Sequence, residues 1–510
     1  MTVTNSMFPF SSGTIRNQQY ARMLLQMRGQ MDDLQQQIAS GKKSQTFGGL
    51  GDMRVSSLTF RNQTGVTDGY SNVIDLTEIR LKIMDQSTNE LRTLVDGARA
   101  SMLKTRGTGG YPEITASVKQ VQAQFEQMVT SLNAQHEGLY LYSGRTRDTR
   151  PVVDANTIMW GDGTNAGLRQ VIDERRQADL GVTGLGRMTT SLVGSNVTLA
   201  EDAVGNPFGI KLVAGSVGGS MSNITVTGPA GAPPQINFNF TGLPLNGERI
   251  SFSVTLPDGK TMNLGFAANE AGTADDTVFN IGATPAATAA NLQAAINSRL
   301  SSIGQGELRA ASGLIAARQF FAGSVTNPVQ RVAGPPFNTS IAYAPVGSRP
   351  TVIWYRGDDD TLVNARDTQR AEIDSGTAIS LGARANETAL RDSMVALGMF
   401  LAEDYPPGFA STKDRYDAAS SRAIQVMNTT GGPNAILEMN GDFGRAGALV
   451  LSTKTRHEDR KVFLDSVLAE IENTNKEEAI LQLTSLQRTL EASYTITSRL
   501  SQLSLVNYLR

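Results

Sequence analysis

The stretch YARMLLQMRGQMDDLQQQI, residues 20–38, decides the fold of this chain. Its apolar side chains recur at alternating intervals of four and three residues: Tyr20, Leu24, Met27, Met31, Leu34 and Ile38. This spacing predicts a helix with one narrow apolar stripe, which packs against another helix. Gly41 marks the expected end of this helix, and the segment from Phe47 to Gly51 predicts a loop.

The other end of the chain repeats the pattern. Apolar residues from Ile436 to Ile471 predict a long helix whose seam is interrupted by the polar residues Thr453, His457 and Arg460. A break is expected near Asn473-Thr474-Asn475. Beyond it a second stripe continues almost to Arg510, formed by Leu483, Leu486, Leu490, Tyr494, Leu500 and Leu503.

Four further helices are predicted between the two ends: Tyr70 to Met102, Pro112 to Leu139, Ala385 to Leu401 and Tyr416 to Val426. Between the second and third of these, glycine and proline are frequent and helical periodicity fades. The chain therefore leaves one end as helices, passes through a different kind of structure, and returns as helices.

The central region carries a clear hairpin signal. Ile250 to Leu256 and Met262 to Phe266 alternate apolar and polar residues, and Asp258-Gly259 between them is the pair preferred by tight type I′ turns. A helix is expected from Pro285 to Leu300. These elements predict a small α+β domain, and the run from Val352 to Tyr355 predicts further β structure.

The predicted fold class is mainly α with β-rich insert domains. We expect an elongated molecule in which the N- and C-terminal helices pair in a coiled-coil-like rod, with α+β and β domains between them. The expected divisions are an N-terminal assembly helix (1–45), half of a helical rod (46–150), a β-rich linker (151–184), a variable α+β insert (185–320), a β-rich return segment (321–380), the other half of the rod (381–470) and a C-terminal assembly helix (471–510).

Composition excludes several classes of function. The 510 residues include no cysteine, which excludes disulfides, zinc–thiolate sites and thiol catalysis. The two histidines, His136 and His457, are expected to be partly exposed helix residues, and we predict no metal and no cofactor. With a net charge of −2, the chain lacks the excess of positive charge that is typical of nucleic-acid-binding proteins. No stretch approaches the ~20 apolar residues of a membrane span, and Met1 to Ser12 lacks the pattern of a Sec-type signal peptide.

Short motifs predict no catalytic site. Gly259-Lys260-Thr261 resembles the end of a phosphate-binding loop, but Val254 occupies the position where that loop requires a glycine. Arg356-Gly357-Asp358 fits a solvated turn better than a recognition tripeptide. Carboxylates are common, but the sequence does not pair them. We therefore predict no enzymatic activity, with a secreted carbohydrate-active enzyme as a remote alternative.

The apolar stripes at the two ends allow two interpretations. Any single stripe is explained by an internal helical bundle. Both terminal stripes, however, reach almost to the chain ends with little else in the chain to cover them, and packing against further copies would bury more apolar surface. The predicted assembly interface is therefore the two stripes, Tyr20 to Ile38 and Leu483 to Leu503.

Both ends are similar to one known family. The run from Ile15 to Lys43 resembles the first helix and turn of the flagellin superfamily, and Glu478 to Tyr494 resembles its final helix. With the helices between them, the resemblance covers about residues 1–150 and 380–510. Within the superfamily, Asn133 to Gly144, Trp354 to Asp359 and the ending Ser501 to Leu509 are most similar to the junction proteins that connect hook and filament.

The resemblance implies a structural subunit of the bacterial flagellum, which serves motility and joins hook to filament as a ring assembled through terminal helices. It also implies unfolded export through the flagellar type III apparatus without a cleaved signal, and an extracellular location. The implied partners are further copies of the chain, hook-associated protein 1, flagellin and a flagellar export chaperone. The glycine-rich segment from Thr46 to Gly51 departs from the junction pattern, so flagellin, the filament subunit itself, is the alternative.

Overall fold

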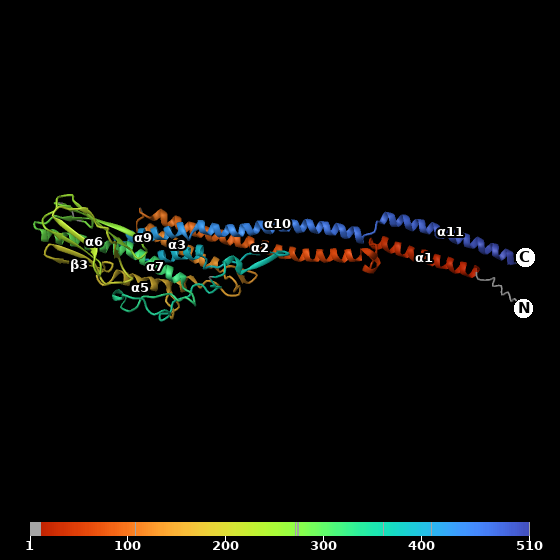
Figure 1. Cartoon of the computed structure of the whole chain (residues 1–510), viewed down its shortest axis with the longest axis horizontal. Coiled ribbons are helices and arrows are strands. Elements are labelled where there is room, and N and C mark those ends of the chain that lie inside the picture. Colours follow the sequence, from red (N-terminus) through yellow and green to blue (C-terminus); the bar gives the residue numbers. More distant parts are fainter. Residues whose placement is uncertain are drawn as a thin grey trace, which may run out of the picture. The chain divides into compact units, whose positions relative to one another are not determined.

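In the computed structural model of the chain, residues 12–508 are described apart from 108, 271, 273, 274, 361 and 410, and side chains 12–17, 220 and 500–508 are not described. The chain is mainly α-helical with several small sheets (Figure 1). It divides into two compact units. Unit 1 comprises the described parts of Met1–Leu76, Glu372–Thr377 and Val450–Arg510, and unit 2 those of Thr77–Ala371 and Ala378–Leu449. No helix among the described residues is both long and apolar enough to cross a lipid bilayer.

The predicted terminal helices are present in unit 1. Helix α1 (Ser12–Ser40) lies beside α11 (Lys476–Tyr508), as Figure 1 also shows. The expected break near residue 474 is confirmed, because α10 (Pro433–Glu472) ends before it and α11 begins after it. The prediction of a loop at Phe47 to Gly51 is wrong. These residues belong to the short helix η1 (Phe47–Met53), which leads directly into α2 (Arg54–Thr105). The first turns of α2 carry too few regularly spaced apolar residues for periodicity to detect them.

The two helix breaks in unit 1 are joined by backbone hydrogen bonds. The amide of Lys43 donates to the carbonyl of Glu472 at 2.7 Å, and the amide of Thr474 donates to the carbonyl of Gly41 at 3.0 Å. The Thr474 hydroxyl also donates to the side chain of Gln37 at 3.2 Å. Because the carbonyls at helix ends lack partners within their own helix, these contacts satisfy groups from both breaks and fix the two breaks at the same level.

Unit 2 contains the remaining helices and the sheets. Its helices, besides parts of α2 and α10, are α3 (Tyr111–Leu132), α4 (Ala155–Trp160), α5 (Leu168–Leu180), α6 (Pro285–Ile303), the π-helical turn η2 (Gly304–Leu308), α7 (Arg309–Ala322), η3 (Phe337–Thr339), η4 (Ala365–Thr368), α8 (Thr388–Leu401) and α9 (Ser411–Thr429). The four intermediate helices predicted from periodicity are therefore confirmed, with α3 ending earlier than expected.

The linker over residues 151–184 is helical and not β-rich as predicted, because it contains α4 and α5. Helix α5 escaped detection because half of its buried positions are charged: Glu174, Arg175, Arg176 and Asp179 are buried alongside four apolar residues. A face that buries ion pairs does not produce the apolar period on which helix prediction depends.

Residues 185–320 contain both helices and strands, as predicted for the insert. One antiparallel sheet has the order β3 (Met188–Val193), β4 (Asn196–Glu201), β8 (Gln235–Phe240) and β7 (Ile224–Ala230). The other has the order β11 (Val278–Asn280), β10 (Thr261–Asn269), β9 (Arg249–Thr255) and β5 (Lys211–Leu212), with β6 (Gly218–Ser220) also paired to β9. Side chains from both sheets and from α6 form one apolar core, which includes Phe238, Phe252, Phe266, Leu292 and Ile296.

The predicted hairpin is formed by β9 and β10, with Thr255 paired to Thr261. Its turn is not the predicted type I′. The amide of Gly259 donates to the carbonyl of Leu256 at 2.9 Å, the amide of Leu256 donates to the carbonyl of Lys260 at 2.9 Å, and only Gly259 has a positive φ, +84°. This is a three-residue loop, in which a type I turn is followed by one left-handed residue.

The Gly259→Ala substitution is expected to destabilise unit 2 by about 1–2 kcal/mol, because an alanine there must adopt a left-handed conformation. Nothing within 4 Å would contact its Cβ, so the loss reports backbone strain alone. Gly444→Ala, in the interior of α10 and equally free of neighbours, is the matched control and should stabilise by about 0.5–1 kcal/mol. Urea unfolding followed by tryptophan fluorescence measures both; a neutral Gly259→Ala would contradict the loop conformation.

The return segment over residues 321–380 contains less β structure than predicted. It holds the hairpin of β12 (Arg370–Asp374) and β13 (Thr377–Ser380), while Val352 to Tyr355 is extended with isolated bridges. Prolines interrupt the segment repeatedly and cannot donate to a ladder. Asp358 also departs from the expected solvated turn, because it is 9% exposed and accepts a 2.8 Å bond from the guanidinium of Arg145. The short pair β1 (Gln135–His136) and β2 (Leu139–Tyr140) places His136 in a strand, not in a helix as predicted.

Candidate functional site

In the structure, the predicted assembly stripe of α1 lies on a side of this helix that the rest of the chain partly covers. Met27 is buried, and Leu24, Met31, Leu34 and Ile38 are half-buried, whereas Tyr20 is 58% exposed. On α11 the same holds for Leu483, Leu486 and Leu490, which are half-buried, and for Tyr494, which is 43% exposed. Leu500 and Leu503 belong to α11, but their side chains lie outside the described residues. Within one chain, the two stripes are thus only partly covered.

A second group of apolar side chains on the same two helices was not predicted. Met23 and Leu25 on α1, and Ile480, Leu481 and Ile496 on α11, are each about half exposed or more; we call these five residues the outer apolar surface. They fall between the stripe positions, so a search for one narrow seam passes over them. Among the described residues, unit 1 exposes more large apolar side chains than it buries, since Val55, Leu58, Val66, Leu76, Leu451, Val462 and Phe463 are also exposed.

One of the polar residues predicted to interrupt the seam of α10, His457, is buried inside unit 1. His457 is 3% exposed, not partly exposed as predicted, and its Nε2 lies 3.0 Å from the carbonyl oxygen of Ile373. Its ring stacks on Tyr70, with 5.8 Å between the centroids. Arg456 binds the neighbouring Asp374 at 2.5 Å. Because buried polar groups need partners, these contacts fix the tip of the β12–β13 hairpin on α10.

Near the helix breaks of unit 1, a carboxylate ties α2 to the end of α10. Glu472 accepts hydrogen bonds from Arg61 Nε at 2.6 Å, from Arg61 Nη2 at 2.5 Å and from the Ser57 hydroxyl at 2.7 Å. The hydrogen bond from Arg61 is the largest cause that lowers the pKa of Glu472 to about 2, and it outweighs the opposing effect of burial. The bidentate geometry makes this one of the stronger types of ion pair.

This ion pair predicts how the stability of unit 1 depends on pH. The pKa of Glu472 in the folded chain lies below the ~4.3 of an unfolded glutamate, so the folded state binds fewer protons. The pair therefore stabilises fully above about pH 4.3, and its contribution is lost as the pH falls towards 2. Thermal unfolding followed by circular dichroism should show a deficit for Glu472→Gln at pH 6 that shrinks at pH 3. Glu477→Gln, at an exposed position on α11, is the control; a deficit independent of pH would contradict the assignment.

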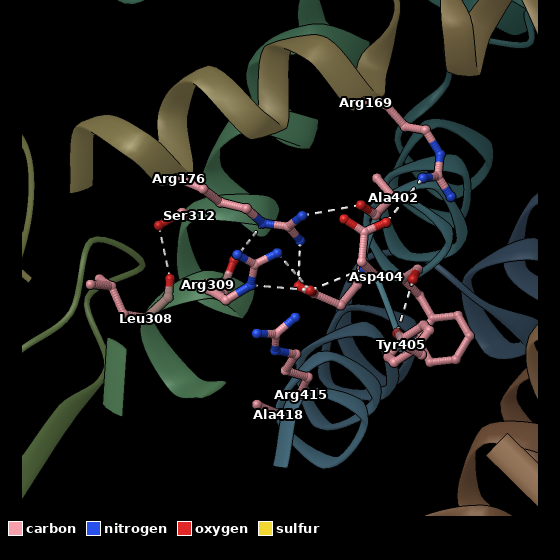
Figure 2. Close-up of polar contacts among 12 residues, drawn as sticks. Arg169, Arg176, Leu308, Arg309, Ser312, Ala402, Asp404, Tyr405, Arg415 and Ala418 are labelled. Atoms are coloured by element: carbon pink, nitrogen blue, oxygen red, sulfur yellow. Dashed lines mark hydrogen bonds and ion pairs between the residues drawn. The ribbon is translucent and has the colours of Figure 1, made fainter. Parts of the chain in front are cut away.

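Unit 2 contains a buried cluster of charged residues, shown in Figure 2. Glu403 follows α8 and its side chain is 1% exposed; it pairs with Arg176 of α5 at 2.5 Å and with Arg309 of α7 at 3.0 Å. Arg176 also donates to the carbonyl of Ala402 at 3.1 Å, and Arg169 donates to that of Leu401 at 2.5 Å. The two guanidinium groups thus satisfy carbonyls at the C-terminal end of α8, where positive charge is favoured.

The chemistry of this cluster fits a structural role. Burial lowers the pKa of Arg176, against the opposing influence of Glu403, and raises the pKa of Tyr405 well above its usual value. The Tyr405 hydroxyl donates to the carbonyl of Phe400 at 3.0 Å, so its proton is held by the backbone. Glu403 is shared by two arginines and by the amide of Asp404, so its oxygens are engaged. The cluster joins three helices and offers no free base or nucleophile.

Metal binding and sequence comparison add no further site. Among the described residues, no group of three or more histidine, aspartate or glutamate side chains is placed to hold a metal ion. No protein-family model matches this chain, and no curated protein matches it.

Proposed function

We propose that this chain is a structural subunit of the bacterial flagellum, similar to hook-associated protein 3, and that it joins hook to filament through its terminal helices. The observation that carries the proposal is the outer apolar surface, which leaves Leu25 68% and Leu481 72% exposed on two helices that already lie side by side. The five residues do not form one patch, because Met23 and Leu25, like Ile480 and Ile496, project from different sides of their helices. Single exposed apolar residues need no explanation, but this many on two paired helices suit helices that further copies cover on more than one side.

In this proposal α1 and α11 form a coiled-coil-like pair that is completed by neighbouring copies. The half-buried stripes hold the pair together, and the outer apolar surface of each pair is covered by the terminal helices of adjacent subunits. Full burial of one Leu, Ile or Met side chain contributes about 1.5–3 kcal/mol. Because the five side chains are only about half to 70% exposed, covering them supplies roughly 4–9 kcal/mol per subunit, which is of the same order as the ~4–15 kcal/mol cost of association. The proposed polymer therefore also needs contacts from the half-buried stripes.

The proposal also places the protein outside the cell, exported by the flagellar type III apparatus, with hook-associated protein 1 and flagellin as neighbours and an export chaperone as a transient partner. Flagellin itself is the second candidate, because a filament subunit would use the same terminal helices. A junction protein and a flagellin differ in where they are found along the flagellum and not in the chemistry of their terminal helices. We propose no catalytic role.

The test is immunogold electron microscopy combined with deletion of the gene. A junction protein predicts that mutant cells carry hooks without filaments and release flagellin, and that label on wild-type cells is confined to the end of the hook. Label along the whole filament would assign the chain as flagellin. Absence of label from flagella, together with normal swimming of the mutant, would contradict a flagellar role.

A further inference from the structure

Two arginines of unit 2 carry positive charge that the chain does not neutralise. Arg80 belongs to α2, and Arg147 lies in the turns that follow β2. Both residues are half-buried, and neither forms an ion pair with any acidic side chain among the described residues. Charges that are shielded from water are normally paired, so this arrangement needs an explanation.

The pKa of Arg80 shows that the two guanidinium groups are close together. Burial lowers this pKa, and the positive charge of Arg147 lowers it further, to about 10. No carboxylate in the described part of the chain offsets these two effects. The two groups therefore repel one another without a negative charge between them.

A neutral side chain holds Arg80 in place. Its Nη2 donates to the Oε1 of Gln369, and the Nε2 of Gln369 donates to the carbonyl of Gly144 at 2.6 Å. Gly144 begins the turns that contain Arg147, whose own carbonyl accepts a 2.8 Å hydrogen bond from the amide of Tyr140. An uncharged amide thus contacts Arg80 where a carboxylate would be expected, and the positions of both arginines are set before any ligand arrives.

The acidic residues of the neighbouring segments are engaged elsewhere or exposed. Asp358 and Asp360 pair with Arg145 at 2.8 and 2.7 Å. Asp367 is held by two of its own neighbours in the chain fold. Asp148 is exposed to solvent and pairs with no basic side chain among the residues described. These segments therefore supply no counter-charge for the two arginines.

The nitrogens that a ligand can reach are the terminal ones. The Nε atoms of Arg80 and Arg147 are buried without a partner among the described residues, so a ligand does not contact them. In contrast, Nη1 of Arg80 and both Nη atoms of Arg147 are accessible, and they donate to no group in the described part of the chain. Two neighbouring guanidinium groups thus present unused donors to the solvent.

We propose that Arg80 and Arg147 together bind a phosphate group, either as the free dianion or as a monoester. The planar fork of a guanidinium matches the spacing of phosphate oxygens, and such charge-assisted hydrogen bonds are among the strong ones. One dianion neutralises both arginines, whereas a single carboxylate would leave one of the two charges uncompensated. This inference does not depend on the proposed assembly.

The binding test uses the full chain as a monomer in a phosphate-free buffer of fixed ionic strength. Inorganic phosphate and methyl phosphate are separate probes; at least one should bind in calorimetry, and the tighter one tells whether the group is bound free or as an ester. Arg147→Gln should weaken this binding about 10-fold or more, because charge-assisted hydrogen bonds are lost. Arg318→Gln, which changes an exposed arginine of α7, is the control and should leave binding unchanged.

Thermal unfolding distinguishes a ligand site from a structural role. Because Arg147 repels Arg80, Arg147→Gln should unfold without phosphate at the same temperature as the wild type or at a higher one. Added phosphate should raise the midpoint of the wild type and leave that of Arg147→Gln nearly unchanged. A purely structural Arg147 would instead lower the midpoint of the variant in both buffers, which would contradict the proposal.

Three results of the binding test would also overturn it. The first is the absence of binding by both probes at about 10 mM, a concentration that detects even weak sites. The second is binding that Arg147→Gln leaves intact. The third is acetate bound at least as tightly as phosphate, which would assign the pair of arginines to a carboxylate. None of these results affects the flagellar proposal, which is decided by label and by polymerisation.

Discussion

Glu403→Ala is expected to destabilise unit 2 by on the order of 3–5 kcal/mol, because it leaves two buried arginines without their counter-charge. The side chain of Arg176 is 5% exposed and that of Arg309 is 19% exposed, so water replaces the lost carboxylate poorly, above all at Arg176. Both tryptophans belong to unit 2, and urea unfolding followed by their fluorescence therefore reports this unit specifically.

The neighbouring residue supplies a control for this prediction. Asp404 also pairs with an arginine, Arg169, at 3.4 Å, but its side chain is 67% exposed. Exposed ion pairs contribute about 0–1 kcal/mol, so Asp404→Ala should be nearly neutral. If Glu403→Ala lost less than about 1 kcal/mol, the cluster would not be the strong link between α5, α7 and α8 that its burial implies.

The double variant Leu25→Asp and Leu481→Asp is expected to abolish self-assembly while leaving the subunit folded. Both side chains are about 70% exposed, so their replacement changes the stability of the free subunit by only about 0.5 kcal/mol each. In a polymer, each aspartate would instead bury a charge in an apolar contact, which is strongly unfavourable. Sedimentation velocity and negative-stain electron microscopy measure the loss of polymer, and circular dichroism verifies the fold.

The matched control places the same charges elsewhere on the same helices. Gln35→Asp and Gln487→Asp change exposed polar residues of α1 and α11 and should leave polymerisation intact. If both double variants failed to polymerise, net charge and not the outer apolar surface would be responsible. If both polymerised normally, the terminal helices would have to associate through other residues, and the proposed assembly surface would be wrong.

Helices and strands with regularly spaced apolar residues were predictable from the sequence. Elements whose buried positions carry charged residues were not. The stripes of α1 and α11, the break near Thr474 and the β9–β10 hairpin all follow from spacing and turn residues. The turn type was missed because a preferred dipeptide does not fix the loop length, which depends on the pairing of Leu256 with Lys260.

The misses concern contacts between residues far apart in the chain. Helix α5 was hidden because its buried face carries Glu174 and Arg176, whose partners are supplied by distant segments. His457 was expected to be partly exposed, because no local signal indicates that Ile373 covers it. A hollow lined by Asn327, Asp359 and Arg391 likewise joins residues of several separate segments. Sequence periodicity describes one face of one element, and it cannot report which distant side chains meet there.

The hydrogen bonds that join the two helix breaks of unit 1 also determine where the chain can be lengthened. Lys43 and Glu470 are 427 positions apart, yet the Lys43 ammonium donates to the Glu470 carbonyl at 2.6 Å, beside the backbone bonds that align α1 with α11. The facing partners of the terminal helices are therefore set locally. Doubling a connecting loop adds only about 0.6 kcal/mol of closure entropy. An exposed turn within residues 185–320, such as the one between β3 and β4 at Gly194, can accordingly be lengthened without shifting the register at the chain ends, which makes it suitable for displaying foreign peptides.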